Sequence, residues 1–229
     1  MSAASKVILI FGSGPRTGQK IAVAFATKGY KVAETSRSAK EDDGNTEGSL
    51  KIKTDLSNPE SVSRAFEEVK AKLGTPSVVV YNASAVTFAD KKSPLSISVS
   101  DFTQTLNINV LSAYLAAKHA AEGFSTLPET AARTFIYTGN ATNEIVLPGF
   151  LDQGVGKSGA AHMMKVASTF YAERGFKFYY ADERTIEGAP VYMAIDGEAH
   201  GRHYADLAEG DAQGPWQQTF VKNEGYKKF

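Results

Sequence analysis

The stretch VILIFGSGPRTGQK, residues 7–20, decides the fold, because an apolar run leads directly into a glycine-rich turn and then into a helical segment. In such a turn backbone N–H groups can approach a phosphate while the helix N-terminus faces it. The alternative, a tight turn with only a structural purpose, has the same glycines. The position in the first strand-to-helix connection favours a phosphate-binding turn made of Gly12, Ser13, Gly14, Pro15, Arg16, Thr17 and Gly18, in which the three glycines supply backbone freedom.

Composition limits the classes of protein to which the chain can belong. The 229 residues are 42% hydrophobic, which suits one domain over residues 1–229. Lys and Arg together number 25, as do Asp and Glu, so no net charge favours nucleic acid or a membrane surface, and we expect neither as a partner. The absence of cysteine excludes disulfides and thiolate metal sites, and with no signal-like segment at the start we expect a cytoplasmic protein.

Short apolar runs alternate with segments of helical spacing along most of the chain. The runs are 6–11, 31–35, 49–54, 77–81, 134–138 and 176–181. This alternation predicts an α/β fold with a doubly wound parallel sheet, a Rossmann-type three-layer α/β/α arrangement in one domain. The irregular segment at about 183–214 is expected to be a lid-like insertion on the substrate side, with a packing arm or subunit contact as the alternative.

Several motifs, in order along the chain, resemble those of the short-chain dehydrogenase/reductase family. The signature T-G-x-x-x-G-x-G fits Phe11–Gly18, with Arg16 at the middle glycine, and TDLSNPESV resembles the segment whose Asp lies beside the adenine. The resemblance implies that a dinucleotide is bound by a set that adds Asp55, Leu56, Asn82, Ala83 and Ser84 to the turn. In LNINVLSAY it places the structural and catalytic asparagine of the family at Asn109.

The end of the second strand favours one form of the cofactor. In ETSRS, Ser36 stands where relatives that prefer NAD have Asp, and Arg37 follows where an arginine can bind a 2′-phosphate. Arg16 is expected to be a second cation near that phosphate. NADP(H) is therefore preferred over NAD(H), although two solvated arginines would give the same pattern and Glu34 lies close by.

The chemistry departs from the family pattern. Relatives use Y-x-x-x-K, in which the tyrosine is the general acid. Here the resemblance assigns the lysine to Lys157, the tyrosine place to Gln153 and the serine place to Asn140, with Thr138 two residues earlier. A carboxamide does not exchange a proton near neutral pH, so the usual acid is missing. The candidate catalytic residues are Lys157, Asn109, Gln153 and Asn140, and Lys157 also belongs to the cofactor set.

Three functions remain open on these residues. The favoured one is an NADP(H)-dependent oxidoreductase that reduces a small carbonyl or imine, with the proton from Lys157, a nearby tyrosine or water. The second is a catalytically silent protein that binds or senses NADP(H). The third is a non-redox enzyme, an isomerase, lyase or cyclase, in which the amides stabilise developing charge.

Several other features complete the expectations. Small residues on helices 101–123 and 154–174 favour a homodimer or homotetramer through this pair, and packing inside one subunit is the alternative. No metal is expected, because His200, His203 and Glu198 lack a ligand spacing. Asp182, Glu183 and Arg184 are expected just past the sixth strand, either as substrate contacts or as a surface ion cluster.

Overall fold

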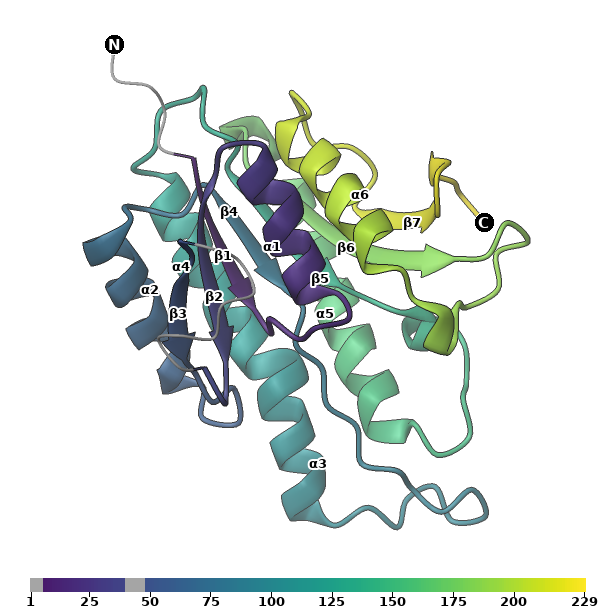
Figure 1. Ribbon diagram of the computed structural model, residues 1–229. Helices are drawn as coiled ribbons and strands as arrows, with labels where there is room; N and C mark the ends of the chain where they lie inside the picture. Colours follow the sequence, from purple (N-terminus) through teal and green to yellow (C-terminus); the bar gives the residue numbers. More distant parts are fainter. Residues whose placement is uncertain (1–5, 40–47) are drawn as a thin grey trace.

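The computed structural model describes residues 6–39 and 48–229, which form one mixed sheet covered by helices on both faces (Figure 1). The strand order is β3-β2-β1-β4-β5-β6-β7-β8, and every pairing is parallel except that of β7 with β8. The strands are β1 Val7–Phe11, β2 Lys31–Ser36, β3 Leu50–Lys53, β4 Val78–Tyr81, β5 Thr134–Thr138, β6 Lys177–Arg184, β7 Gln217–Val221 and β8 Gly225–Tyr226.

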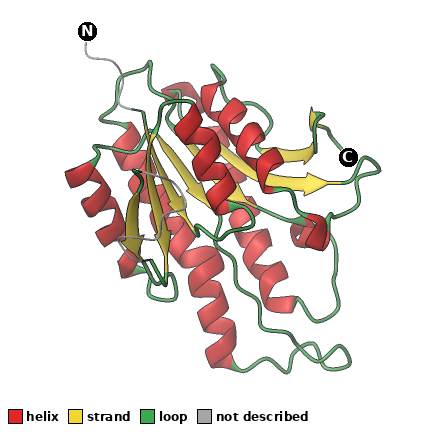
Figure 2. Cartoon of the chain, in the orientation of Figure 1, coloured by secondary structure: helices red, strands yellow, loops and turns green. Residues whose placement is uncertain are grey.

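The helices form two layers, with α2, α4 and α5 on one face of the sheet and α1 and α6 on the other (Figure 2). Within the described ranges, no helix combines the length and the apolar character that crossing a membrane requires. The helices are α1 Gly18–Thr27, α2 Glu60–Lys72, α3 Val99–Leu106, α4 Ser112–Phe124, α5 Leu151–Phe170 and α6 Gly197–Glu209; a π-helical segment spans Asn107–Leu111, and 3-10 turns span Ala141–Asn143, Ala172–Arg174 and Tyr192–Ala194.

Strand β1 shows why this sequence builds two cores. Its residues Val7, Leu9 and Phe11 pack in the core beneath α2, α4 and α5, whereas Ile8 and Ile10 pack in the core beneath α1 and α6. Successive side chains of a strand point to opposite faces, so a strand covered on both faces needs an unbroken apolar run. The doubly wound sheet predicted from these runs is confirmed.

The long helix expected over residues 101–123 is interrupted by the π-helical segment Asn107–Leu111, which no residue pattern announced. Buried tyrosines accompany the interruption. The Tyr81 hydroxyl donates to the Ile108 carbonyl, and the Tyr137 hydroxyl donates to the Asn109 carbonyl at 3.0 Å. Two strands of the sheet therefore satisfy the backbone at the place where the regular helical ladder changes.

The segment 183–214 divides into parts with different surroundings. Strand β6 continues to Arg184, so Asp182–Arg184 lie within the strand and not past it. Helix α6 within this segment begins at Gly197 and packs against α1, where a Cβ on Gly201 would be 2.8 Å from Ala24 Cβ. Beyond strand β6, the residues of this segment that border the large cleft are Pro190–Met193, Ile195 and His200, so the part that can act as a lid is shorter than expected.

The small residues of α4 are packed inside this chain. Its five alanines are all buried in the core between α4 and the sheet: Ala113, Ala116, Ala117, Ala120 and Ala121. On α5, Ala160 and Ala161 are buried in the same core, and Gly159 is exposed. Packing within one subunit accounts for most of the pattern that suggested an oligomer.

Candidate active site

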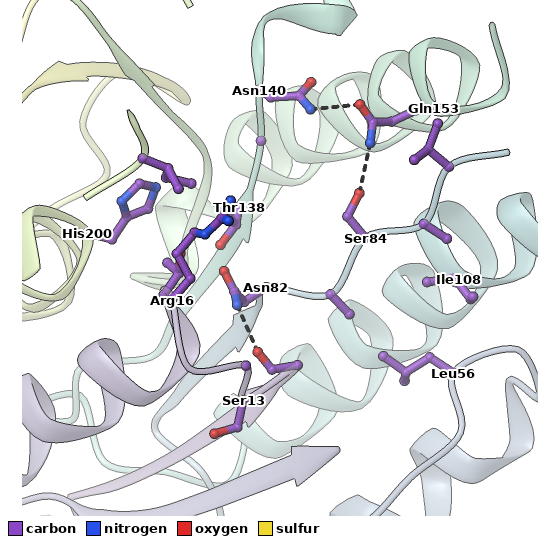
Figure 3. Close-up of a pocket in the computed structure, with 18 of the residues that line it drawn as sticks. Ser13, Arg16, Leu56, Asn82, Ser84, Ile108, Thr138, Asn140, Gln153 and His200 are labelled. Atoms are coloured by element: carbon purple, nitrogen blue, oxygen red, sulfur yellow. Dashed lines mark hydrogen bonds between the residues drawn. The ribbon is translucent and has the colours of Figure 1, made fainter. Parts of the chain in front are cut away.

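A cleft of about 1140 Å³ opens at the carboxyl ends of the central strands, where ligands bind in open α/β sheets. Its walls come from the turn after β1, the ends of β2, β4, β5 and β6, the first two turns of α5, and residues 190–195. Figure 3 shows the cleft from one side, with Leu56 and Ile108 at one end and His200, Thr138 and Arg16 at the other. Nearly every residue of the expected cofactor set borders this cleft.

The glycine-rich turn needs two of its three glycines. Gly12 has a φ of +92°, and a Cβ there would be 2.7 Å from Ala83 N; a Cβ on Gly18 would overlap the Gly12 carbonyl. Gly14 has a φ outside the left-handed region and no heavy atom within 4 Å of a Cβ position, so the surrounding protein does not require glycine there. Asn82 fixes the turn by donating from Nδ2 to the Gly12 carbonyl at 2.8 Å.

The expected adenosine end is made by Asp55, Leu56 and Arg37. The Asp55 carboxylate accepts from Ser57 N at 3.0 Å and from Ser57 Oγ at 2.8 Å. These bonds lower the pKa of Asp55, the charge of Arg37 lowers it further, and both residues border the cleft. Leu56 is buried in the cleft wall, Ser36 ends β2, and Arg37 is exposed.

The Glu34 carboxylate is bound by neighbouring side chains that the sequence did not predict as its partners. It is buried under the turn and forms an ion pair with Lys51 at 2.5 Å. Its carboxylate also accepts from Ser49 Oγ at 2.9 Å and from Ser13 Oγ. Because these partners occupy the carboxylate, Glu34 is held within the wall of the cleft.

Asn109 lies behind the wall of the cleft, not in it. Its Nδ2 donates to Ala85 O at 2.8 Å, and its Oδ1 accepts from Ala85 N at 2.9 Å. Gly156 allows this approach, because a Cβ there would be 2.7 Å from Asn109 Cβ. Asn109 therefore holds the segment after β4 in place, and the catalytic contact expected of it is not made by its side chain.

Three polar side chains meet across the opposite part of the cleft (Figure 3). Asn140 Nδ2 donates to Gln153 Oε1 at 3.0 Å, and Gln153 Nε2 reaches Ser84 Oγ at 3.5 Å. Asn140 Oδ1 is occupied, since it accepts from Thr142 N at 3.0 Å. The amides that the sequence singled out are thus side by side, and their remaining N–H groups are the donors available to a ligand.

Lys157 is one helical turn beyond Gln153 on α5 and is only 2% exposed. Its Nζ donates to Thr138 O at 2.9 Å and lies 4.6 Å from the ring centre of Tyr137. Burial lowers the pKa of Lys157 to about 7, and the nearby charge of Asp182 opposes the shift. Lys157 can therefore gain or lose a proton near neutral pH.

Two α6 residues that sequence reasoning did not assign to the site lie beside Thr138. The Tyr204 hydroxyl donates to Thr138 Oγ1 at 2.9 Å, and His200 borders the cleft. His200 Nδ1 is 2.8 Å from Asp196 O and 3.5 Å from Glu183 Oε2, while burial lowers its pKa to about 4, so the ring is neutral. No motif marks these residues, because α6 must first be placed against α1.

The acidic and basic residues at the end of β6 form a buried pair. Arg184 Nε donates to Asp182 at 2.5 Å, and Arg184 Nη2 contacts Glu144 at 3.2 Å. Burial raises the pKa of Asp182 to about 6, although Arg184 opposes the shift. Asp182, Glu183 and Arg184 are buried, so the alternative of a surface ion cluster is wrong. Asp182 and Glu183 also border the cleft. Among the residues that the structure describes, no cluster of His, Asp or Glu is arranged to hold a metal.

Comparison with known proteins identifies the family. A family model described as enoyl-(acyl carrier protein) reductase matches residues 17–181. The short chain dehydrogenase/reductase dmxR12 of Cryptosporiopsis sp. (strain 8999) is 44% identical over 237 residues, covering 98% of this chain and 95% of the relative.

Solved structures of low identity share the fold. A short-chain type dehydrogenase/reductase from Mycobacterium marinum matches with a TM-score of 0.77 at 20% identity, covering 96% of this chain and 94% of the other. BdcA, solved in complex with NADPH, matches with a TM-score of 0.74 at 19% identity, covering 99% and 97%. The extended match to dmxR12, together with the family model and the shared sheet, shows that the chain belongs to the short-chain dehydrogenase/reductase family of oxidoreductases, which bind a nicotinamide cofactor.

Proposed function

We propose that the protein is an NADP(H)-dependent oxidoreductase that reduces a small carbonyl or imine. The observation that carries the proposal is the continuous cleft that joins Arg37 and Asp55 at one end to Asn140, Gln153 and Lys157 at the other. The cleft suits an extended dinucleotide, because the glycine-rich turn, Asp55 and Lys157 all border one continuous space. When bound, the nicotinamide supplies a hydride, and the chain's own residues must orient the acceptor and provide a proton.

The preference for NADP(H) over NAD(H) follows from the charges at the adenosine end. Within β2, Lys31–Ser36, the one carboxylate is Glu34, and Lys51 with two serine hydroxyls occupies it. Glu34 is therefore a poor partner for a ribose diol and offers little repulsion to a 2′-phosphate. Arg37 is exposed beside Asp55 and can pair with that phosphate through charge-assisted bonds. The NADPH bound by BdcA is consistent with this choice.

The residues of the reaction end suggest how turnover proceeds without a tyrosine at residue 153. We assign orientation of the substrate oxygen or nitrogen to the free N–H groups of Asn140 and Gln153. As hydride reaches the substrate carbon, the Lys157 ammonium gives a proton to the oxygen and is restored from water. An iminium substrate needs no proton at this step, since the hydride alone neutralises it. Asn109 acts as a positioning residue through Ala85.

The pKa of Lys157 gives this mechanism a pH signature. Because that pKa is about 7, the ammonium is lost as the pH rises through neutrality, and carbonyl reduction should slow above about pH 7. Iminium reduction should lack this decline, provided the substrate remains protonated. The same decline for both substrate types would contradict the assignment of the proton to Lys157.

The test begins with binding and then measures turnover. Calorimetry should show binding of NADPH, and loss of the reduced cofactor's absorbance should follow with some members of a panel of carbonyls and imines. Arg37→Asp should weaken NADPH by at least about tenfold while sparing NADH, because a charge-assisted pair is lost. Lys31→Asp, the same charge reversal at the exposed start of β2, should change neither affinity.

Two outcomes would redirect the proposal. NADPH binding without turnover of any compound would favour the silent binding protein, for which the neutral Asn140–Gln153 pair is a specific argument. Chemical change in a substrate without cofactor oxidation would favour the non-redox enzyme. Absence of binding by either nucleotide would remove the proposed function altogether.

We also propose a cytoplasmic homodimer or homotetramer. Its contact would use the outer surfaces of the π-helical segment, α4 and α5, where Leu111, Tyr114, Val155, Val166 and Phe170 are between 43% and 77% exposed. Apolar side chains in such number on adjoining helices favour burial against a second copy. Light scattering should give at least a dimer for the natural chain and a monomer for Tyr114→Glu, whereas a monomeric natural chain would overturn the proposal.

A further inference from the structure

Arg16, the residue that interrupts the glycine signature, is attached to α6 through its backbone. The first residue of α6 is Gly197, and a Cβ at Gly197 would overlap the Arg16 carbonyl. The side chain of Lys20 also borders this position, with its Cγ 2.9 Å from where the Cβ would lie. The close approach fixes the end of the glycine-rich turn against the start of α6, on the side of the cleft opposite β2.

The Arg16 side chain continues in the same direction. Its Nη1 contacts Met193 Sδ at 3.8 Å, which is the one hydrogen bond that its guanidinium makes within the described part of the chain. A thioether is a weak acceptor, and Arg16 is exposed, so most of the five N–H donors of the guanidinium remain available to an anion. Little free energy holds the guanidinium at Met193.

The two arginines at the cleft therefore serve different parts of it. The charge of Arg37 lowers the pKa of Asp55, the residue before Leu56 in the chain. Figure 3 shows the Arg16 side chain among Thr138, His200 and Asn82, with Leu56 across the cleft. A 2′-phosphate belongs to the adenosine end, where Arg37 lies, and Arg16 extends toward the middle and the reaction end.

We infer that Arg16 binds the diphosphate of the dinucleotide and not its 2′-phosphate. This inference rests on the proposed function, and it corrects the sequence-based expectation for Arg16. The diphosphate joins the two nucleoside halves, so it must pass the glycine-rich turn from which Arg16 projects. A guanidinium binds two phosphate oxygens at once, and the weak sulfur contact costs little to exchange. The arginine that replaces a glycine thus replaces close backbone approach with a side-chain contact.

The test compares two arginines with two nucleotides by calorimetry. Arg16→Met should weaken NADP(H) and NAD(H) by similar factors of at least about tenfold, because both contain the diphosphate. Arg37→Met should weaken only NADP(H). Lys20→Met, which removes a charge from the exposed first turn of α1, is the matched control and should change neither affinity.

A fragment and a conservative variant make the test sharper. ADP-ribose contains the diphosphate without nicotinamide or 2′-phosphate, so Arg16→Met should weaken it and Arg37→Met should not. Arg16→Lys, which keeps the charge but not the forked donors, should lie between the natural chain and Arg16→Met. Thermal unfolding of each variant should match the natural chain, since the exposed Arg16 side chain has one weak internal partner.

The outcomes separate this inference from the proposed function. Selective loss of NADP(H) in Arg16→Met would return Arg16 to the 2′-phosphate and overturn the inference. Unchanged affinity for all three ligands would show that Arg16 only contacts Met193, which also overturns it. If the natural chain binds none of these ligands, the proposed function fails before Arg16 is tested.

Discussion

Glu34 and Lys51 face each other on neighbouring parallel strands and form an ion pair beneath the glycine-rich turn. They are register partners of β2 and β3, and their side chains are only 1% and 10% exposed. Ser13 Oγ donates to the same carboxylate, so the ion pair is joined to the turn itself. The sheet register thus places a neutralised acid where a free one would face the ribose.

Removing Lys51 should destabilise the fold, because the buried Glu34 carboxylate would lose its cation. Lys51→Met leaves the Glu34 carboxylate without its cation and should lower the free energy of unfolding by about 3 kcal/mol. Lys53→Met, on the exposed edge of the same strand, should have almost no effect. Glu34→Gln combined with Lys51→Met should recover much of the loss. Urea unfolding measures all three, and equal values for Lys51→Met and Lys53→Met would contradict the coupling.

Lys157 should make stability depend on pH in a defined window. Its pKa is about 7 in the fold against 10.5 for an ordinary lysine, so between these values the unfolded chain binds more protons than the folded one. The free energy of unfolding should therefore rise with pH from about 7 to about 10.5, relative to Lys157→Met, which lacks the group. Lys165→Met, exposed on the same helix, should follow the natural chain. If the free energy of unfolding depends on pH in the same way in the natural chain and in Lys157→Met, the pKa of Lys157 is not lowered by burial.

The core and the glycine-rich turn were predictable because their signals are local. An unbroken apolar run gives β1, and the periodic positions Ile21, Ala22 and Phe25 give the buried face of α1. The end of β6 was not predictable, because Asp182, Glu183 and Arg184 resemble a loop when their partners are unknown. They are buried in a strand because Arg184 pairs with Asp182 and Glu183 accepts from Asp196 N at 2.8 Å.

The sequence indicated which residues lie at the cleft better than it indicated which contacts they make. The family resemblance selected Asn140, Gln153 and Lys157, and the end of one strand and the start of one helix bring the three to the same part of the cleft. The ion pair of Glu34 with Lys51 depends on strand register, which side-chain patterns in single segments do not contain. The direction of a long side chain such as Arg16 depends on α6, which lies far away in the sequence.

Tyr204 provides a test of how α6 supports the reaction end. Its hydroxyl is fully buried and donates to Thr138 Oγ1, so Tyr204→Phe should lower the free energy of unfolding by about 1 kcal/mol. Tyr226→Phe, in which the tyrosine is 43% exposed on β8, is the control and should be neutral. Chemical denaturation of both variants measures the difference. An unperturbed Tyr204→Phe would mean that the bond adds nothing beyond what water gives the unfolded chain.

The turn itself yields a pair of substitutions with opposite expectations. Gly12→Ala puts a Cβ 2.7 Å from Ala83 N at a φ of +92°, and it should cost about 2 kcal/mol or more through strain and overlap. Gly14→Ala meets no atom within 4 Å and has no left-handed φ. It should be neutral or stabilise the fold by up to about 1 kcal/mol, because the unfolded chain loses freedom. Thermal and urea unfolding compare the two, and nucleotide titration should show intact affinity for Gly14→Ala. A loss of nucleotide affinity in Gly14→Ala without a loss of stability would mean that glycine at residue 14 serves the ligand and not the local backbone.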